Sequence, residues 1–203
     1  MSSDFAVYLV DDNAAVLKAV TRLLRTEGLD VRAYQSAHRF LAEHDKEIPG
    51  CVILDISMPD CDGREVHQKL NAAGAGRPII FLTGQGNIPM SVEAMRSGAV
   101  DFLTKPVQRD MLLAAIERAR LRDRQDRRHR EAQREVQGRL SCLTPREREV
   151  MTYVVAGRLN KQIAAELGTV EKTIKVHRSR MMSKLGVRNV ADLVRMSERA
   201  SVA

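Results

Sequence analysis

Five polar side chains within the first 105 residues lie where short nonpolar stretches end, and their chemistry is complementary. Asp11 with Asp12, Asp55 and Thr83 come directly after apolar stretches, and Lys105 closes another stretch. Three carboxylates brought close together could not all be charged at neutral pH without a counter-ion. Mg²⁺ suits that role because it prefers a few carboxylate oxygens together with waters and phosphate oxygens. The acids therefore predict a magnesium site, provided that the fold brings them together.

The same residues have the chemistry for phosphoryl transfer. Asp55 would act as a carboxylate nucleophile and become an acyl phosphate. The metal and Lys105 would neutralise charge on the transferred group, and Thr83 would offer a hydroxyl. Any one of these residues alone would be interpreted as a solvated residue of a strand-end turn. Their occurrence together at four strand ends favours the functional interpretation.

The elements that must position these side chains alternate between strand and helix. Short β-prone stretches each lead into a segment with apolar residues at helical spacing, and they cover residues 5–10, 31–34, 51–55, 78–82 and 100–104. Such repeats predict an α/β fold with five parallel strands and helices on both faces of the sheet. Because the strands run parallel, the ends that carry the polar residues would meet in one crevice.

These stretches resemble the receiver domain of bacterial two-component response regulators over roughly residues 5–120. The matching motifs are Val10-Asp11-Asp12, Leu54-Asp55-x-x-Met58-Pro59-x-x-x-Gly63, Thr83-Gly84 and Lys105-Pro106. The resemblance implies a flavodoxin-like (βα)5 domain with a five-stranded parallel sheet. Residues 85–89 and 98–103 are most similar to the FixJ-like branch of the FixJ/NarL family.

The resemblance also implies a role for individual residues. Asp55 would accept a phosphoryl group from a sensor histidine kinase, with Lys105 beside it, and Thr83 and Phe102 would form the conformational switch. The magnesium ligands would be Asp11, Asp12, Asp55 and the backbone carbonyl of Ser57. The Lys105–Pro106 bond is expected to be cis. Asn13 stands where many receivers have a third acid, so we expect weaker or altered metal affinity.

Residues 121–139 differ in composition from the segment before them, because the apolar pattern stops and arginine becomes abundant. Two acids precede bases by four residues, Asp123 before Arg127 and Asp126 before Arg130, which is typical of a solvent-exposed helix. A basic arm lying on DNA is the alternative, which we favour less because acids are interleaved throughout. We expect a charged helical linker.

Residues 140–203 predict four short helices. Thr144 and Glu147 have the spacing of a capping box at the start of the first helix. Asn160 is expected to cap the second helix, which is joined through Gly168 to a longer basic third helix. Two helices joined in this way predict a helix-turn-helix whose second helix enters the major groove. The alternative is a small helical bundle that binds protein and whose charges are solvated.

This segment closely resembles the LuxR-type DNA-binding domain in residues 143–150, 160–164 and 170–178. By that resemblance Lys175, Val176 and Ser179 face base edges. The candidate phosphate contacts are Lys161, Lys172, Thr173, His177, Arg178 and Arg180. On the third helix, the basic residues expected on the exposed side are Lys172, Lys175, Arg178 and Lys184.

The net charge of +7 is unevenly distributed: residues 1–107 carry −3, residues 108–139 carry +4 and residues 140–203 carry +6. An acidic part joined to a basic part favours nucleic acid as a partner of the basic part. The three cysteines have neither disulfide nor zinc-site spacing, no apolar run has the length of a membrane span, and the first residues do not resemble a signal peptide. We therefore expect a cytoplasmic protein with no membrane partner.

The sequence thus predicts a response regulator of a two-component system, with a receiver domain in residues 1–120, a linker in 121–139 and a DNA-binding domain in 140–203. Phosphorylation of Asp55 would promote homodimerisation and sequence-specific binding to promoter DNA, and RNA polymerase is a further candidate partner. We expect no enzymatic activity beyond the Mg²⁺-dependent gain and loss of the phosphoryl group on Asp55.

Two other functions fit parts of the sequence. An aspartyl-phosphate phosphatase would need a second acid two residues after the nucleophile, where Ser57 stands, and a cap insertion to enclose its substrate. A binding module that works without phosphorylation is the second hypothesis. It is less favoured because Asp55, Thr83 and Lys105 are all present.

Overall fold

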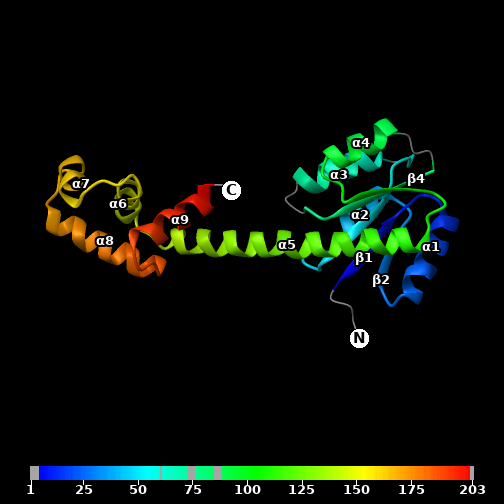
Figure 1. The fold of residues 1–203 in the computed structure, drawn as a ribbon, viewed down its shortest axis with the longest axis horizontal. Helices are drawn as coiled ribbons and strands as arrows, with labels where there is room; N and C mark the ends of the chain where they lie inside the picture. Colours follow the sequence, from blue (N-terminus) through cyan, green and yellow to red (C-terminus); the bar gives the residue numbers. More distant parts are fainter. Residues whose placement is uncertain (1–4, 60, 73–75, 85–87, 202–203) are drawn as a thin grey trace. The chain divides into compact units, whose positions relative to one another are not determined.

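The computed structural model describes residues 5–59, 61–72, 76–84 and 88–201. The chain forms two compact units, Met1–Arg127 and Arg128–Ala203 (Figure 1). None of the helices within the described ranges is both long and apolar enough to span a membrane.

The first unit is an α/β domain in which strands and helices alternate. Its strands are β1 (Ala6–Val10), β2 (Asp30–Tyr34), β3 (Gly50–Asp55), β4 (Ile79–Thr83) and β5 (Asp101–Thr104). Its helices are α1 (Ala14–Thr26), α2 (Ala37–Glu43), α3 (Gly63–Ala72), α4 (Ile88–Arg96) and the first part of α5 (Arg109–Ser141). The predicted alternation of five strands with helices is confirmed.

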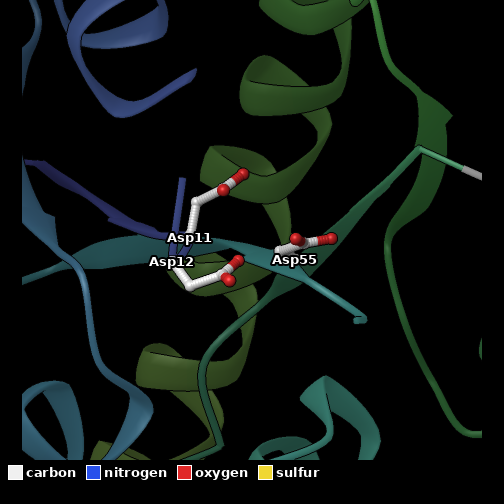
Figure 2. Close-up of side chains that lie close together, drawn as sticks. All are labelled: Asp11, Asp12 and Asp55. Carbon is white, nitrogen blue, oxygen red and sulfur yellow. The ribbon is translucent and has the colours of Figure 1, made fainter. Parts of the chain in front are cut away.

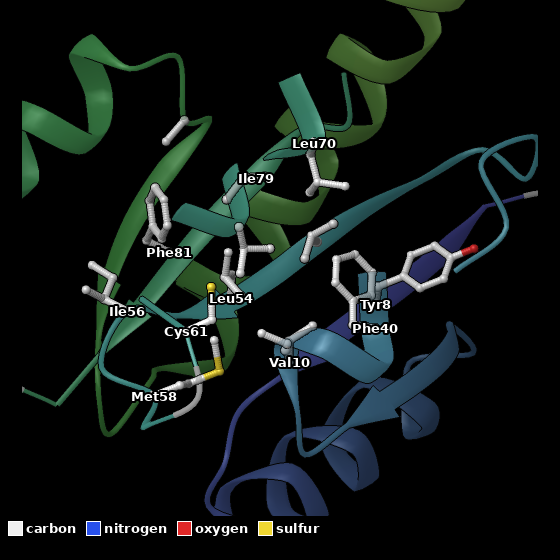
Figure 3. Packing of buried hydrophobic residues seen from close by; sticks show 14 of the residues in the cluster. Tyr8, Val10, Phe40, Leu54, Ile56, Met58, Cys61, Leu70, Ile79 and Phe81 are labelled. Carbon is white, nitrogen blue, oxygen red and sulfur yellow. The ribbon is translucent and has the colours of Figure 1, made fainter. Parts of the chain in front are cut away.

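All neighbouring strands pair in parallel, in the order β2-β1-β3-β4-β5. Side chains of β1 alternate between two cores. Tyr8 and Val10 pack on the face covered by α2, α3 and α4 (Figure 3). Val7 and Leu9 pack on the face covered by α1 and α5. Burial on both faces explains why the central strands read as nearly continuous apolar runs.

Local side-chain bonds determine where two of the helices begin. The Asn13 side chain accepts hydrogen bonds from the N–H groups of Ala15 and Val16 at 3.0 and 3.3 Å, so it caps α1. Ser36 caps α2 by accepting from the N–H of Arg39, as the sequence predicts. Helix α1 therefore starts immediately after the acids that follow β1.

Helix α4 carries an apolar face that the first unit does not cover. Ile88, Val92 and Met95 are 80%, 44% and 48% exposed. The sequence places Val92 and Met95 on one face of a helix, and that face is the exposed one. Exposed apolar residues gathered on one helix face are typical of an interaction surface.

Helix α5 is a single helix of 33 residues, and its first part packs on the sheet. Asp123 is only 2% exposed, and its carboxylate accepts from the Arg127 Nε at 3.1 Å. Arg127 also donates to the carbonyl of Glu47 at 2.9 Å. The predicted Asp123–Arg127 pair is confirmed, but the exposure expected there is wrong for Asp123. The predicted linker begins packed against the loop between α2 and β3.

The second unit contains residues 128–141 of α5 and the helices α6 (Pro145–Val155), α7 (Asn160–Glu166), α8 (Glu171–Leu185) and α9 (Val190–Ser201). Its buried core includes Val150, Ile163, Ile174 and Leu193, one from each of these four helices. The capping box at Thr144 is confirmed.

The predicted cap of α7 is wrong by one residue. Leu159 occupies the N-cap position, and its N–H donates to the Gln162 side chain at 2.8 Å. Asn160 is the first residue of the helix, and its side-chain oxygen accepts instead from Arg178 at 3.0 Å. The short polar side chain that looked like a cap therefore bonds to the following helix.

Candidate functional site

Three carboxylates gather at the ends of two neighbouring strands (Figure 2). Asp11 and Asp12 directly follow β1, and Asp55 is the last residue of β3. One carboxylate oxygen from each lies within 4.8 Å of those of the other two. Asp11 is fully buried and Asp55 is 5% exposed, whereas Asp12 is exposed. The fold thus brings the three predicted acids together, with one of them open to solvent.

Lys105 bridges two of these acids. Its ammonium lies 2.6 Å from Asp11 Oδ2 and 3.0 Å from Asp55 Oδ2. Burial raises the pKa of Asp55, and the hydrogen bond from Lys105 opposes that rise. Burial works to lower the pKa of Lys105, but its bonds to both carboxylates raise it above the ordinary value. Lys105 is therefore a charged partner for the acids, as phosphoryl-group recognition requires.

Backbone contacts hold the strand ends in place around the acids. The N–H of Lys105 donates to the carbonyl of Thr83 at 2.7 Å, which ties the residue after β5 to the end of β4. The Lys105–Pro106 bond is cis, as the resemblance implies. The N–H of Asn13 donates to Asp11 Oδ1 at 2.9 Å and orients that carboxylate.

Gly63 makes a close approach at the site possible. A Cβ atom on Gly63 would lie 2.4 Å from the carbonyl oxygen of Asp55, and the Gly63 N–H donates to the carbonyl of Ile56 at 3.0 Å. Only a residue without a side chain fits between this loop and the end of β3. Gly63 belongs to the motif around Asp55, and its packing gives a physical reason for that position.

The other residues predicted for this site lie around the same edge of the sheet. Thr83 is fully buried at the end of β4, one residue beyond Leu82, which is the register partner of Asp55. Phe102 on β5 is partly buried against the core under α4. Ser57 is exposed two residues after Asp55. The FixJ-like stretch at residues 85–89 falls partly outside the described residues, which resume at Ile88.

The donor set fits a divalent cation of the magnesium type. Asp11, Asp12 and Asp55 supply three carboxylates, and the single ammonium of Lys105 contacts only two of them. Carboxylate oxygens are the ligands that Mg²⁺ prefers, and an exposed acid such as Asp12 leaves room for coordinated water. A cation here and the ammonium of Lys105 could together stabilise charge on a phosphoryl group at Asp55.

The second unit places most of the predicted DNA contacts on accessible surface. The exposed ones are Lys161, Lys172, Lys175, Val176, Ser179 and Arg180, and the partly buried ones are Thr173, His177 and Arg178. All but Lys161 lie on α8, so one helix carries both the residues assigned to bases and most of those assigned to phosphates. Helix α8 is therefore the candidate for the helix that enters the major groove.

Contacts within the unit already hold two of these side chains. Lys175 pairs with Glu171, one turn earlier, at 3.1 Å, and Arg178 donates to Asn160. Arg178 therefore joins α8 to α7. The resemblance assigns it a phosphate contact as well.

Lys184 is exposed on α8, as predicted, but its ammonium is paired with a carboxylate of α6. Its ammonium lies 2.7 Å from Glu147 Oε2 and 3.3 Å from the carbonyl of Cys142. The Lys184 ammonium, together with the N–H of Thr144, lowers the pKa of Glu147 to about 2. The sequence contains a signal for this contact, because Lys184 follows the buried Met181 by three residues and lies on the same side of the helix.

Solved structures of other proteins have a similar fold. Response regulator StyR superposes with a TM-score of 0.80 at 42% identity, with 96% of this chain and 98% of that chain covered. Full-length FixJ from B. japonicum gives a TM-score of 0.56 at 36% identity, with 98% of each chain covered. A receiver-like sheet followed by a helix-turn-helix unit defines the class of two-domain, DNA-binding regulators.

Known sequences identify the family. Residues 7–117 match the family described as "Response regulator receiver domain", and residues 141–197 match "Bacterial regulatory proteins, luxR family". Response regulator protein TodT of Pseudomonas putida is 42% identical over 193 residues, 95% of this chain and 85% of that protein. Transcriptional regulatory protein FixJ of Bradyrhizobium diazoefficiens is 36% identical over 202 residues, 100% of this chain and 98% of that protein. The chain belongs to the response regulators with a receiver domain and a LuxR-type DNA-binding domain, and the predicted FixJ-like resemblance is confirmed.

Proposed function

We propose that this response regulator is switched by phosphorylation of Asp55. The observation that carries the proposal is the ammonium of Lys105, held between Asp55 and Asp11 at the edge of the sheet. Asp55 would attack a phosphohistidine of a sensor histidine kinase and become an acyl phosphate, while the histidine leaves. Lys105 would bind the transferred oxygens, and Thr83 would supply a hydroxyl from the neighbouring strand.

The proposed magnesium ligands are Asp11, Asp12, Asp55 and the backbone carbonyl of Ser57. The close grouping of the three carboxylates supports this assignment. Bound Mg²⁺ would neutralise charge on the phosphoryl oxygens. We also propose that the chain has no enzymatic activity other than the gain and loss of this phosphoryl group.

The proposed readout is homodimerisation through α4, β5 and α5. The exposed face of Ile88, Val92 and Met95 supports a self-complementary contact, because a twofold dimer uses the same patch on both copies. Thr83 and Phe102 would respond to the phosphoryl group and shift the protein between an inactive and an active state. A dimer presents two recognition helices to two half-sites and so raises the effective affinity for DNA.

We propose that the regions 1–120, 121–139 and 140–203 serve as receiver, linker and DNA-binding domain. Promoter DNA is the proposed target of α8, with Lys175, Val176 and Ser179 at base edges. The remaining predicted contacts, Lys161, Lys172, Thr173, His177, Arg178 and Arg180, would bind phosphates, which is supported by their basic or polar character. RNA polymerase is a further proposed partner, and the cytoplasm is the proposed compartment.

Sedimentation velocity with Mg²⁺, with and without acetyl phosphate, tests the phosphorylation switch, with Asp55→Asn as the matched control and intact mass as a second readout. We expect a phosphoryl adduct and a dimer only for the unmodified protein. An adduct without a dimer would refute the dimer readout and leave the acceptor in place. An adduct on Asp55→Asn would refute the acceptor, and no adduct at all would favour a module that works without phosphorylation.

A further inference from the structure

The last turn of α5 contacts the end of the recognition helix. The Arg139 Nη1 donates to the carbonyl of Leu185, the last residue of α8, at 3.2 Å. The other arm of the guanidinium lies 2.6 Å from Glu135 Oε1, one turn earlier in α5. Arg139 is therefore held on its own helix while it reaches the carboxyl end of α8.

The contacted end of α8 has the features that make a cation effective. The last carbonyls of a helix have no partner within the helix, and they carry the negative end of its dipole. Gly186 closes α8 in the left-handed conformation at φ +66°, and a Cβ placed there would lie 3.6 Å from Arg139 Nη1. Lys184 anchors the same turn to Glu147 and to the carbonyl of Cys142. Arg139 and Lys184 thus hold this end from two sides.

The α5 side of the Arg139 contact lies before the part of the chain that the LuxR-family match covers. The match begins at residue 141, whereas Glu135 and Arg139 belong to α5. Residues 128–141 of α5 nevertheless form one compact unit with α6–α9. The end of the predicted linker is therefore a structural part of the DNA-binding unit.

We propose that Arg139 is a positioning residue for sequence-specific DNA recognition, which it serves by fixing the carboxyl end of α8. This rests on the proposed role of α8 in reading bases. Lys175 lies ten residues before Leu185, or about 15 Å along the helix. A tilt of about 5° around the carboxyl end would move Lys175 by about 1 Å, which is enough to misalign a hydrogen bond to a base edge. Non-specific attraction to phosphates tolerates such a shift.

The proposal differs from a purely stabilising role in a measurable way. The Arg139 side chain is 42% exposed, so its loss should change the stability of the unit little. It should change the ratio of specific to non-specific binding much more. Arg134, an exposed arginine of the same helix, provides a control that removes the same charge.

The test compares Arg139→Ala, Arg139→Lys and Arg134→Ala in the full-length protein treated with acetyl phosphate and Mg²⁺. The probes are a DNA duplex enriched from a random pool by the unmodified protein and a shuffled duplex of the same composition. We expect Arg139→Ala to lose about tenfold in affinity for the enriched duplex, which corresponds to one well-placed base contact. Arg139→Lys should recover part of that loss, and Arg134→Ala should weaken binding to both duplexes equally.

The outcomes separate this proposal from the proposed function. Equal specificity ratios for Arg139→Ala and Arg134→Ala would overturn the positioning role and leave DNA recognition by α8 in place. Failure of the unmodified protein to enrich any duplex would overturn DNA recognition and the positioning role together. If calorimetry shows that Arg139→Ala fails to fold, Glu135→Gln takes its place, because it removes the ion pair that holds the Arg139 guanidinium on α5. An unchanged ratio in that variant would likewise overturn the proposal.

Discussion

Gly63→Ala offers a sharp test of how the structure around Asp55 is held. The new methyl group would lie 2.4 Å from the carbonyl oxygen of Asp55, about 1 Å closer than ordinary van der Waals contact at 3.4 Å or more. Both the obstructing atom and the hydrogen bond from Gly63 to Ile56 belong to the backbone, so no side chain can rotate away. Overpacking of this kind costs about 1–3 kcal/mol. For a unit of this size that lowers the Tm by about 4–12 °C.

The same shift should slow phosphorylation. The Asp55 backbone must move by about 1 Å, and a displacement of that size at a reacting group can cost about 100-fold in rate. Calorimetry of the full-length protein measures the unfolding transition of the first unit, and intact mass after timed exposure to acetyl phosphate measures labelling of Asp55. Gly76→Ala is the matched control, because a Cβ there meets nothing within 4 Å. Should Gly63→Ala match the control in both Tm and labelling rate, the steric argument would be wrong.

Three further predictions concern the second unit. The Lys184 ammonium lowers the pKa of Glu147 to about 2 from an ordinary 4.5, so the stability that this carboxylate provides is complete above about pH 5 and is lost as the pH falls toward 2. The stability gap between the unmodified protein and Glu147→Gln in calorimetry should close over that range, and a constant gap would contradict the pairing. Asn160→Ala removes the acceptor of Arg178 and should destabilise the unit by about 1–2 kcal/mol in urea unfolding, whereas an unchanged midpoint would mean that the bond contributes nothing. Lys175→Ala should weaken binding to an enriched duplex more than to a shuffled one, and equal losses would reassign Lys175 to the phosphate backbone.

The sequence predicts the sheet and its acidic edge well because both depend on local patterns. Apolar runs that end in Asp11 or Asp55 locate the strands, and parallel pairing brings their ends together without further information. Asn13 caps α1 through contacts that are also local, but this role was not predicted. Asn13 was interpreted only as the residue that replaces a third acid. Prediction worked for the strands and for the acids at their ends, whereas local patterns alone did not locate the caps of α1 and α7.

The misses arise where partners come from distant elements. Asp123 has the spacing of an exposed helix pair, yet it is buried, and its partner Arg127 also bonds to the loop between α2 and β3. Lys184 is exposed as expected, but its contact with Glu147 is missed, because that partner lies 37 residues earlier in the chain. Helical spacing tells which side of a helix a residue occupies, and only the packed structure tells what lies on that side.

Lys105 also constrains how the proposed switch can transmit a signal. Its ammonium already contacts Asp11 and Asp55 before phosphorylation, and only an interaction that differs between two states can shift their populations. Thr83 is the better candidate for the differential contact, because a phosphoryl group would give its hydroxyl a strong new acceptor. Thr83→Ala should therefore still acquire the phosphoryl group on Asp55 but fail to dimerise in sedimentation with Mg²⁺ and acetyl phosphate. Lys105→Ala should lose labelling and dimerisation together. A labelled Thr83→Ala protein that dimerises as strongly as the unmodified one would assign the switch to other residues.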